Sequence, residues 1–219
     1  MTTIEVLDDP AEAVAELLAQ AAGAGGQVVL TGGSSPQRAY ELAAQRAPDW
    51  GGATVWFTDE RCVPPDDERS NFGMVEQALL ARLVQPPRVM RMLGELGPDA
   101  GADAYAGELG DDPRFNLVLL GLGPDAHIAS LFPGKPEKHV TDRLVVGVPE
   151  AGMEPYVPRI SLTLPALSAT RHAVFLVTGA GKAEAVRRAF GDAPDPESPA
   201  THIRADEVTV FLDPAAAGR

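Results

Sequence analysis

The sequence predicts an α/β protein built on one open, parallel-dominated sheet that is covered by helices on both faces. Short apolar segments alternate along the chain with helical segments that carry one apolar face, an order typical of parallel sheets. Several of those apolar segments run into glycine-rich or polar turns, as strands do where a sheet ends. The chain has 219 residues, of which 45% are apolar and 22% charged. This composition suits a single domain over residues 1–219.

The first predicted elements alternate in the expected way. Ile4 to Leu7 forms a short strand, and the next helix has Asp9 as N-cap, Pro10 as first residue and Glu12 as capping-box partner. The elements that follow are expected as strands at Gln27–Leu30 and Thr54–Phe57 and as a helix at Gln37–Arg46.

The same alternation continues to the end of the chain. Thr58 to Pro65 is expected to be a polar turn, and Ser70 is the N-cap of a helix with apolar residues at helical spacing. Further strands are expected at Arg88–Leu93, Phe115–Leu120, Leu144–Val148, Arg159–Leu164, His172–Val177 and Val208–Leu212. Helices are expected at Asp99–Leu109 and Ala183–Phe190, with a loop at Gly191–Pro199.

Charge and cysteine content narrow the classes of partner. Eighteen Lys and Arg against 31 Asp and Glu give a net charge of -13, which repels nucleic acid and anionic membranes. An anionic substrate would therefore need a local basic pocket. The one cysteine, Cys62, excludes an internal disulfide and a multi-cysteine metal site. The sequence has no leader-like N-terminus and no apolar run of membrane-spanning length, so we expect a cytoplasmic protein.

Four polar turns follow predicted strands. The carboxyl ends of parallel strands lie at one edge of the sheet, where α/β folds bind their ligands, so residues far apart in the sequence can face one cleft. The four turns are Thr31–Pro36, Thr58–Arg61, Gly121–His127 and Gly179–Lys182.

The first and fourth turns suit a phosphate. Gly32 and Gly33 expose backbone N–H groups, and Ser34 and Ser35 add hydroxyls at a helix N-terminus. A plain strand-to-helix turn is the alternative. Lys182 stands at a helix start, where its ammonium opposes the helix dipole and calls for an anionic ligand, unless it is simply solvated. The segment TGAGK lacks the first glycine and the final Ser or Thr of a Walker A loop.

The second and third turns carry the groups suited to acid–base chemistry. Asp59, Glu60 and Arg61 follow a strand directly, and Arg61 can bind phosphate or carboxylate oxygens or else pair with a carboxylate inside the loop. His127 has Asp125 two residues away, which can orient the imidazole so that it accepts a proton from water. A structural histidine bonded to backbone is the alternative.

Other chemistries find little support. Gly121 to Ala126 formally matches a GxGxxA dinucleotide fingerprint, but Pro133 shortens the following helix and no acidic residue ends the next strand. We therefore expect no nicotinamide cofactor. The absence of HExxH and GxSxG also disfavours zinc-peptidase and serine-esterase chemistry, and we expect no metal.

Several segments together resemble a known family. They are TGGSSP, FTDERCVPPDDERSNFG, LLGLGPDAHIASLFPG, PRISLTLPALSATRHAVFLVTGAGKAEAV and PATHIR, spread from about Thr31 to Ile203. They are similar to the 6-phosphogluconolactonases of the glucosamine-6-phosphate isomerase/6-phosphogluconolactonase family. DERxVP and SLFPG distinguish these from the related deaminases.

The resemblance implies a fold and a reaction. The fold would be a three-layer α/β/α arrangement like that of glucosamine-6-phosphate deaminase, ribose-5-phosphate isomerase and CoA transferases. The reaction would be metal-independent hydrolysis of 6-phospho-D-glucono-1,5-lactone in the oxidative pentose phosphate pathway. The partner would be this small sugar-phosphate lactone, with no cofactor, and the protein a monomer or weak homodimer.

The resemblance also implies roles for individual residues. His127 would be the general base, with Asp125 beside it, and Arg61 would position the substrate. Substrate and phosphate would be held by Gly32, Gly33, Ser34, Ser35, Asp59, Asn71 and Lys182. The chain departs from the family at Ala126, where glycine is usual, and alanine would be strained there if the position requires positive φ.

Two other functions stay open at this stage. A deaminase or isomerase acting on a sugar phosphate would use Asp59 as the base that removes a proton next to a carbonyl. A sugar-phosphate-binding protein without catalysis is the other, and Ala126 is the residue that points to it.

Overall fold

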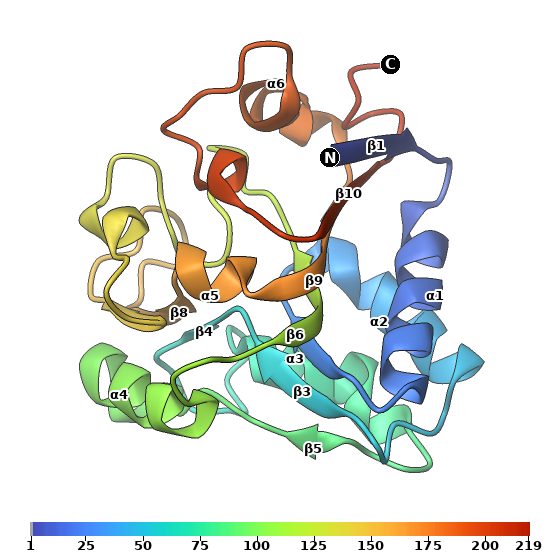
Figure 1. Ribbon diagram of the computed structural model, residues 1–219, viewed down its shortest axis with the longest axis vertical. Helices are drawn as coiled ribbons and strands as arrows, with labels where there is room; N and C mark the ends of the chain where they lie inside the picture. The colour runs from blue at the N-terminus through green and yellow to red at the C-terminus, as the bar shows by residue number, and fades with distance from the viewer. Residues whose placement is uncertain (1) are drawn as a thin grey trace.

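Seven strands form a parallel sheet at the centre of the molecule (Figure 1), as the computed structural model of residues 2–219 shows. The strand order is β1-β10-β9-β6-β2-β3-β5, and every neighbouring pair is parallel. The strands are β1 Thr2–Val6, β2 Gln27–Leu30, β3 Thr54–Phe57, β5 Arg88–Val89, β6 Phe115–Leu120, β9 Thr170–Val177 and β10 Glu207–Leu212. The predicted parallel sheet is confirmed.

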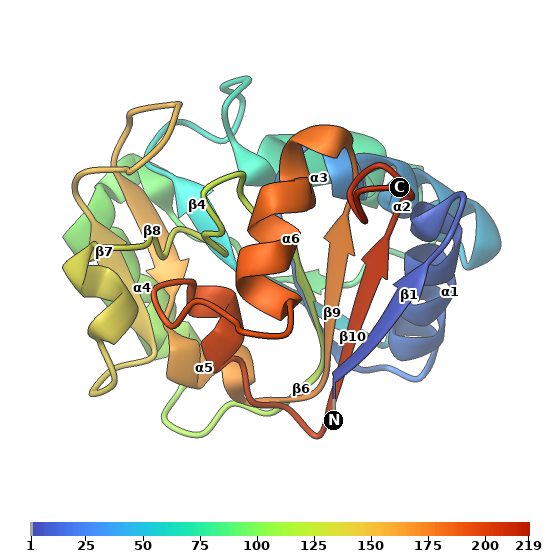
Figure 2. The same cartoon turned by 90° about the horizontal axis from the view of Figure 1, so that it is seen from above.

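Helices cover both faces of this sheet. On one face lie α1 Pro10–Gly23, α2 Ser34–Arg46 and α3 Asn71–Ala78, and on the other lie α4 Pro98–Leu109, α5 Leu164–Ser168 and α6 Ala183–Phe190. Figures 1 and 2 show α1 and α6 on opposite sides of the sheet. Five short 3-10 segments lie between these elements, at Leu80–Arg82, Gly94–Leu96, Pro136–His139, Ala180–Lys182 and Pro199–His202. The three-layer α/β/α fold is confirmed.

The core is split by the sheet into two apolar layers. Val28 and Leu30 of β2 pack with α1 to α3, whereas Val29 packs with α4 to α6, because successive strand side chains point to opposite faces. Most side chains of both layers are fully buried. Strands buried on both sides explain why the segments of this sheet have continuous apolar runs.

A second, three-stranded sheet was not expected. It has the order β4-β8-β7 and is antiparallel, with β4 Asp59–Arg61, β7 Val145–Val148 and β8 Arg159–Leu162. The prediction of a turn at 58–65 is wrong at β4, where Asp59 pairs with Ser161 and Arg61 with Arg159. The sequence did not predict this strand because it consists of three charged residues, and charged residues are generally scarce in strands.

The helix-start predictions had mixed outcomes. Ser70 is the N-cap of α3, and its hydroxyl accepts a hydrogen bond from the Gly73 amide at 3.1 Å. Asp9 stands at the N-cap of α1 but makes no side-chain cap bond, since its carboxylate pairs with Arg38 at 2.6 Å. Glu12 likewise bonds to Arg46, so the capping box is absent.

Several bounds differ from the prediction by one to three residues, and two differences are larger. The strand expected at Arg88–Leu93 covers only Arg88–Val89. Helix α5 begins at Leu164, where the strand expected at Arg159–Leu164 was to end, and continues where no element was predicted. No helix in residues 2–219 is both long and apolar enough to cross a membrane.

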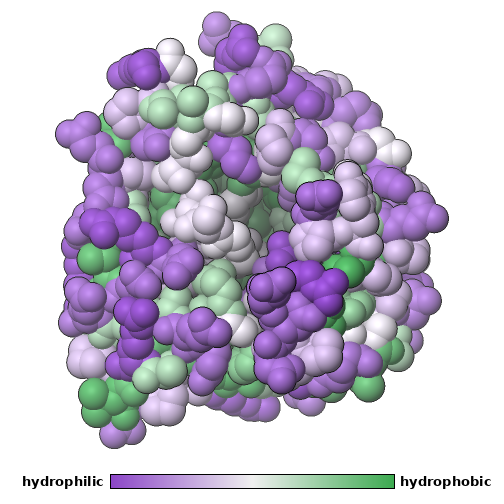
Figure 3. Space-filling view, turned by 180° about the vertical axis from the view of Figure 1, so that it is seen from behind, coloured by the Kyte–Doolittle hydropathy of each residue, from purple (hydrophilic) through white to green (hydrophobic). Residues whose placement is uncertain are grey.

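The carboxyl ends of the central strands all meet at one edge of the sheet. In Figure 2 the arrows of β9, β10 and β1 point to the top of the picture. Figure 3 views the molecule from that side and shows a hollow near the middle of the face, with many hydrophilic residues around it.

Candidate active site

The hollow is a cleft of about 220 Å³ that all four predicted turns line. Nine of the ten residues expected in the site border it, namely Gly32, Gly33, Ser34, Ser35, Asp59, Arg61, Asn71, His127 and Lys182. Asp125, the tenth, lies directly behind His127. The cleft is also lined by Met153, Glu154 and Arg159, which the sequence analysis did not select.

Asp125 and His127 form a hydrogen-bonded pair. The distance between Asp125 Oδ1 and His127 Nδ1 is 2.5 Å, and the same oxygen accepts the His127 backbone N–H at 3.2 Å. Burial raises the pKa of Asp125, but the hydrogen bonds from His127 outweigh it, so the carboxyl pKa lies below its usual value. A carboxylate that accepts the Nδ1 proton leaves Nε2 unprotonated and able to accept a proton.

Gly123 leaves the room that this pair needs. A Cβ at position 123 would collide with the His127 ring and with the Asp125 carboxylate, so no other residue fits without moving them. The Gly123 amide also donates to the His127 carbonyl at 2.8 Å, which closes the turn. The Asp125–His127 pair therefore accounts for this glycine without a bound pyrophosphate.

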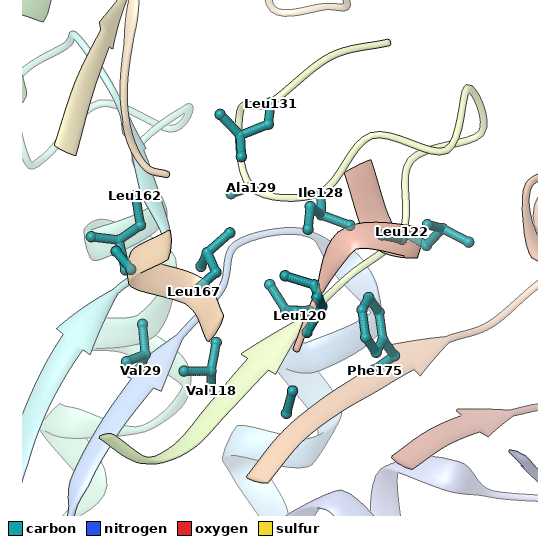
Figure 4. Packing of buried hydrophobic residues seen from close by; sticks show 14 of the residues in the cluster. Val29, Val118, Leu120, Leu122, Ile128, Ala129, Leu131, Leu162, Leu167 and Phe175 are labelled. Atoms are coloured by element: carbon teal, nitrogen blue, oxygen red, sulfur yellow. The ribbon is translucent and has the colours of Figure 1, made fainter. Parts of the chain in front are cut away.

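Apolar packing fixes the far side of the same turn. Figure 4 shows Ile128, Ala129 and Leu131 above the carboxyl end of β6, over Leu120. All four side chains belong to one buried cluster. The ring of His127 also packs on Phe132, with 4.7 Å between ring centroids.

Ala126 adopts a backbone conformation that glycine favours and alanine does not. Its φ is 70°, and its side chain is fully buried. The position therefore requires left-handed backbone, and alanine there is strained. The Asp125–His127 contact forms nevertheless.

The first and fourth turns lie next to each other. The hydroxyls of Ser35 and Thr178 are 2.7 Å apart, and α2 begins at Ser34, so its first-turn amides have no acceptor within the helix. A Cβ on Gly32 would collide with the Asn71 side chain, so this position needs glycine for lack of space.

Lys182 joins the fourth turn to the third. Its Nζ donates to the Leu122 carbonyl at 2.7 Å, and the side chain is partly buried, so the alternative of a fully solvated lysine is excluded. Burial lowers the pKa of Lys182, and the negative charge of Asp125 partly offsets this shift.

Successive side chains of β4 point to opposite sides of the strand, so its three charged residues have different surroundings. Asp59 and Arg61 border the cleft, whereas Glu60 is buried and accepts the amides of Asn71 and Phe72, each at 2.7 Å. The guanidinium of Arg61 donates to the Arg69 carbonyl at 2.6 Å, and its Nε has no partner within residues 2–219.

Arg159 is a cleft residue that sequence reasoning missed. It is 2% exposed, donates to the Met153 and Pro155 carbonyls at 2.8 and 3.1 Å, and stacks on Phe132. Burial lowers the pKa of its guanidinium, and the charge of Asp59 opposes this. The segment PRISLT was assigned only to a strand, although a charged residue in a buried strand indicates a polar site.

A comparison with known protein families decides the relationship. A family model for glucosamine-6-phosphate isomerases/6-phosphogluconolactonase matches residues 2–212. The chain belongs to this family. The 6-phosphogluconolactonase of Streptomyces coelicolor is 38% identical over 221 residues, which cover 92% of this chain and 84% of that protein.

Solved structures have the same fold as this chain. The 6-phosphogluconolactonase of Thermotoga maritima superposes with a TM-score of 0.84 at 29% identity, covering 97% of this chain and 100% of that one. A monomeric glucosamine-6-phosphate deaminase gives a TM-score of 0.78 at 19% identity, covering 99% of this chain and 98% of that one, which supports the shared fold alone.

Proposed function

We propose that the chain is a 6-phosphogluconolactonase, which hydrolyses 6-phospho-D-glucono-1,5-lactone to 6-phospho-D-gluconate in the oxidative pentose phosphate pathway. The family membership and the names of the relatives support the reaction. The observation that carries the mechanism is the 2.5 Å contact between Asp125 Oδ1 and His127 Nδ1 at the edge of the cleft.

His127 is the general base in this mechanism. Asp125 accepts a hydrogen bond from the protonated Nδ1, so Nε2 has a free lone pair. Nε2 removes a proton from water as the water oxygen attacks C1 of the lactone. The bond between C1 and the ring oxygen then breaks, and the imidazolium returns its proton to that oxygen. The product is a carboxylic acid with a free C5 hydroxyl, and the acid ionises in solution.

Different residues of the cleft bind the substrate phosphate and stabilise the oxyanion of the reaction. The phosphate binds to the amides and hydroxyls of the segment from Gly32 to Ser35 and to the Lys182 ammonium. Arg61 faces the oxyanion that develops on C1, because its side chain borders the cleft and its guanidinium is a charged hydrogen-bond donor. Asp59 and Asn71 border the space between them and contact the sugar hydroxyls.

A deaminase or isomerase would need Asp59 as a base. Its carboxylate is 4% exposed and already accepts from Ser130 at 2.7 Å, Thr58 at 3.0 Å and the Asn71 amide at 3.3 Å. Both oxygens of this carboxylate are therefore already bonded to donors of the protein. This observation favours His127 over Asp59 as the proton acceptor. Release of ammonia from glucosamine 6-phosphate would support the alternative.

The test is replacement of His127 by alanine. We expect His127→Ala to lower kcat for freshly generated 6-phosphogluconolactone by about 100-fold or more, with little change in product affinity. A coupled assay corrected for spontaneous ring opening measures this. His139→Ala removes an exposed imidazole from the 3-10 segment Pro136–His139 and is the matched control. Unchanged turnover in His127→Ala would refute the mechanism, and absence of turnover in the wild type would refute the function.

A further inference from the structure

The strained residue Ala126 lies between two peptide groups that are each held from outside the turn. One group carries the Asp125 carbonyl and the Ala126 amide, and the other carries the Ala126 carbonyl and the His127 amide. The φ and ψ angles of Ala126 are the rotations that relate these two planes. Fixing both planes therefore fixes the left-handed conformation of residue 126.

Arg188 of α6 holds the first peptide group. Its Nη1 donates to the Asp125 carbonyl at 3.2 Å, while the Ala126 amide on the other side of the same plane donates to the Gly123 carbonyl at 2.9 Å. Arg188 is itself fixed by Asp195, whose Oδ2 accepts from Nε at 3.0 Å and from Nη2 at 2.8 Å.

Ser198 holds the second peptide group. Its hydroxyl is fully buried and donates to the Ala126 carbonyl at 3.0 Å. The His127 amide on the other side of that plane donates to Asp125 Oδ1 at 3.2 Å. Both planes thus have one hydrogen bond inside the turn and one from the segment that follows β9.

The loop at Gly191–Pro199 connects these two donors. The Asp195 amide donates to the Arg188 carbonyl at 2.7 Å, and the Ser198 amide donates to the Asp195 carbonyl at 2.9 Å. Asp195 Oδ1 also accepts the Glu197 amide at 2.8 Å. The loop is therefore braced against α6, and it presents Arg188 and Ser198 to the same turn.

We propose that Arg188 and Ser198 are positioning residues that hold the turn from Gly123 to His127 in its catalytic geometry, and that this chain depends on them because residue 126 is alanine. The inference rests on the proposed role of His127. Left-handed backbone disfavours alanine by about as much as one or two hydrogen bonds contribute. Without the two outside bonds, Ala126 would return to negative φ and carry His127 away from Asp125. Glycine has no such preference.

The dependence on alanine gives a double-mutant test. We expect Ser198→Ala to lower kcat about tenfold in the natural sequence, with KM changed less than about twofold, because the competent turn becomes a minor conformation. In the Ala126→Gly background the same substitution should lower kcat only about twofold, since glycine still adopts the left-handed conformation about half of the time. Arg188→Gln should show the same difference between backgrounds and serves if Ser198→Ala folds poorly.

Thr170→Val is the matched control for lost stability. Thr170 is fully buried and its hydroxyl bonds to backbone carbonyls, but it lies at the start of β9, at the other end of the sheet from the cleft. We expect this variant to lose stability as Ser198→Ala does and to keep its kcat in both backgrounds.

The second readout is the imidazole of His127 by NMR. The Nδ1 proton bonded to Asp125 should give a downfield resonance that weakens in Ser198→Ala and returns when Ala126→Gly is added. Equal losses of kcat in both backgrounds with an unchanged Nδ1 resonance would overturn the proposal. If the wild type has no lactonase activity, the proposed function fails, and the resonance still decides whether the turn depends on Ser198.

Discussion

At the scale of single residues, Lys182 combines a structural contact with a partly buried charge at the cleft. Its ammonium donates to the Leu122 carbonyl, next to the turn that carries His127, and the side chain also borders the cleft. Burial has moved the pKa of this ammonium below its usual value, with Asp125 opposing the shift. A lysine in this state can bind a phosphate strongly, but only while it is protonated.

This gives a pH-dependent prediction for product binding. Affinity for 6-phosphogluconate should be constant near neutral pH and should fall as pH rises through the lowered pKa of Lys182, because the neutral amine attracts no phosphate. Lys182→Met should weaken 6-phosphogluconate binding about 10- to 100-fold at neutral pH. Lys182→Arg should remove the alkaline decline, since arginine stays charged. Calorimetric titration between pH 7 and 10 measures both effects.

Unphosphorylated gluconate is the control ligand for Lys182. Its affinity should be the same in the wild type and in Lys182→Met. Equal weakening of both ligands would show that Lys182 supports the cleft without binding the phosphate.

Among the elements, β4 connects the cleft to the body of the protein. Glu60 points away from the cleft and is 3% exposed, and its carboxylate accepts from the amides of Arg61, Asn71 and Phe72, each at 2.7 Å, and from the Ser70 hydroxyl at 3.0 Å. It therefore joins β4 to the first turn of α3. Burial raises the pKa of Glu60, and these hydrogen bonds oppose the shift.

Glu60→Gln tests this junction. The amide of glutamine would face backbone N–H donors with a donor of its own, so we expect the free energy of unfolding to fall by about 2–4 kcal/mol. KM should rise as well, because Arg61 and Asn71 border the cleft and lose their anchor. Urea unfolding and steady-state kinetics measure the two effects.

Glu76→Gln is the control on the same helix, since Glu76 is exposed on α3. It should change the free energy of unfolding by less than about 0.5 kcal/mol. A similar loss in both variants would mean that Glu60 acts through general charge and not through its buried bonds.

The sequence predicted the central elements better than the second sheet for a physical reason. The strands from Thr54–Phe57 and Phe115–Leu120 are buried on both faces and are recognisable as apolar runs, and both have the predicted bounds. Strand β4 is held by pairing with β8, which follows about 100 residues later, and local composition contains no trace of that contact. Arg159 was missed for the same reason.

At the scale of the whole molecule, the sheet brings the site together. Turns from residues 31 to 182 meet at one edge because all seven strands of the central sheet are parallel. The sequence predicted that these turns would meet, because each of them follows a predicted strand of a parallel sheet. It could not predict the brace from Arg188 and Ser198, since a loop that follows α6 shows no periodicity to relate it to Ala126.

The two core layers share that sheet, and we therefore expect residues 1–219 to unfold as one cooperative domain. The two tryptophans of the chain report one layer each, because Trp50 packs with α1 to α3 and Trp56 with α4 to α6. Trp50→Phe and Trp56→Phe each keep one reporter. In each variant the urea midpoint by fluorescence should coincide with the midpoint by far-UV circular dichroism.

Ligand binding sharpens this prediction. A ligand that binds only the folded protein raises both midpoints of a variant by the same amount, and we expect 6-phosphogluconate to do so. The cleft draws residues from β4, from α2 and from the turns after β6 and β9, so the ligand contacts elements on both sides of the sheet. If the layers were separate folding units, one probe would shift and the other would stay, and the fluorescence and dichroism curves of at least one variant would separate.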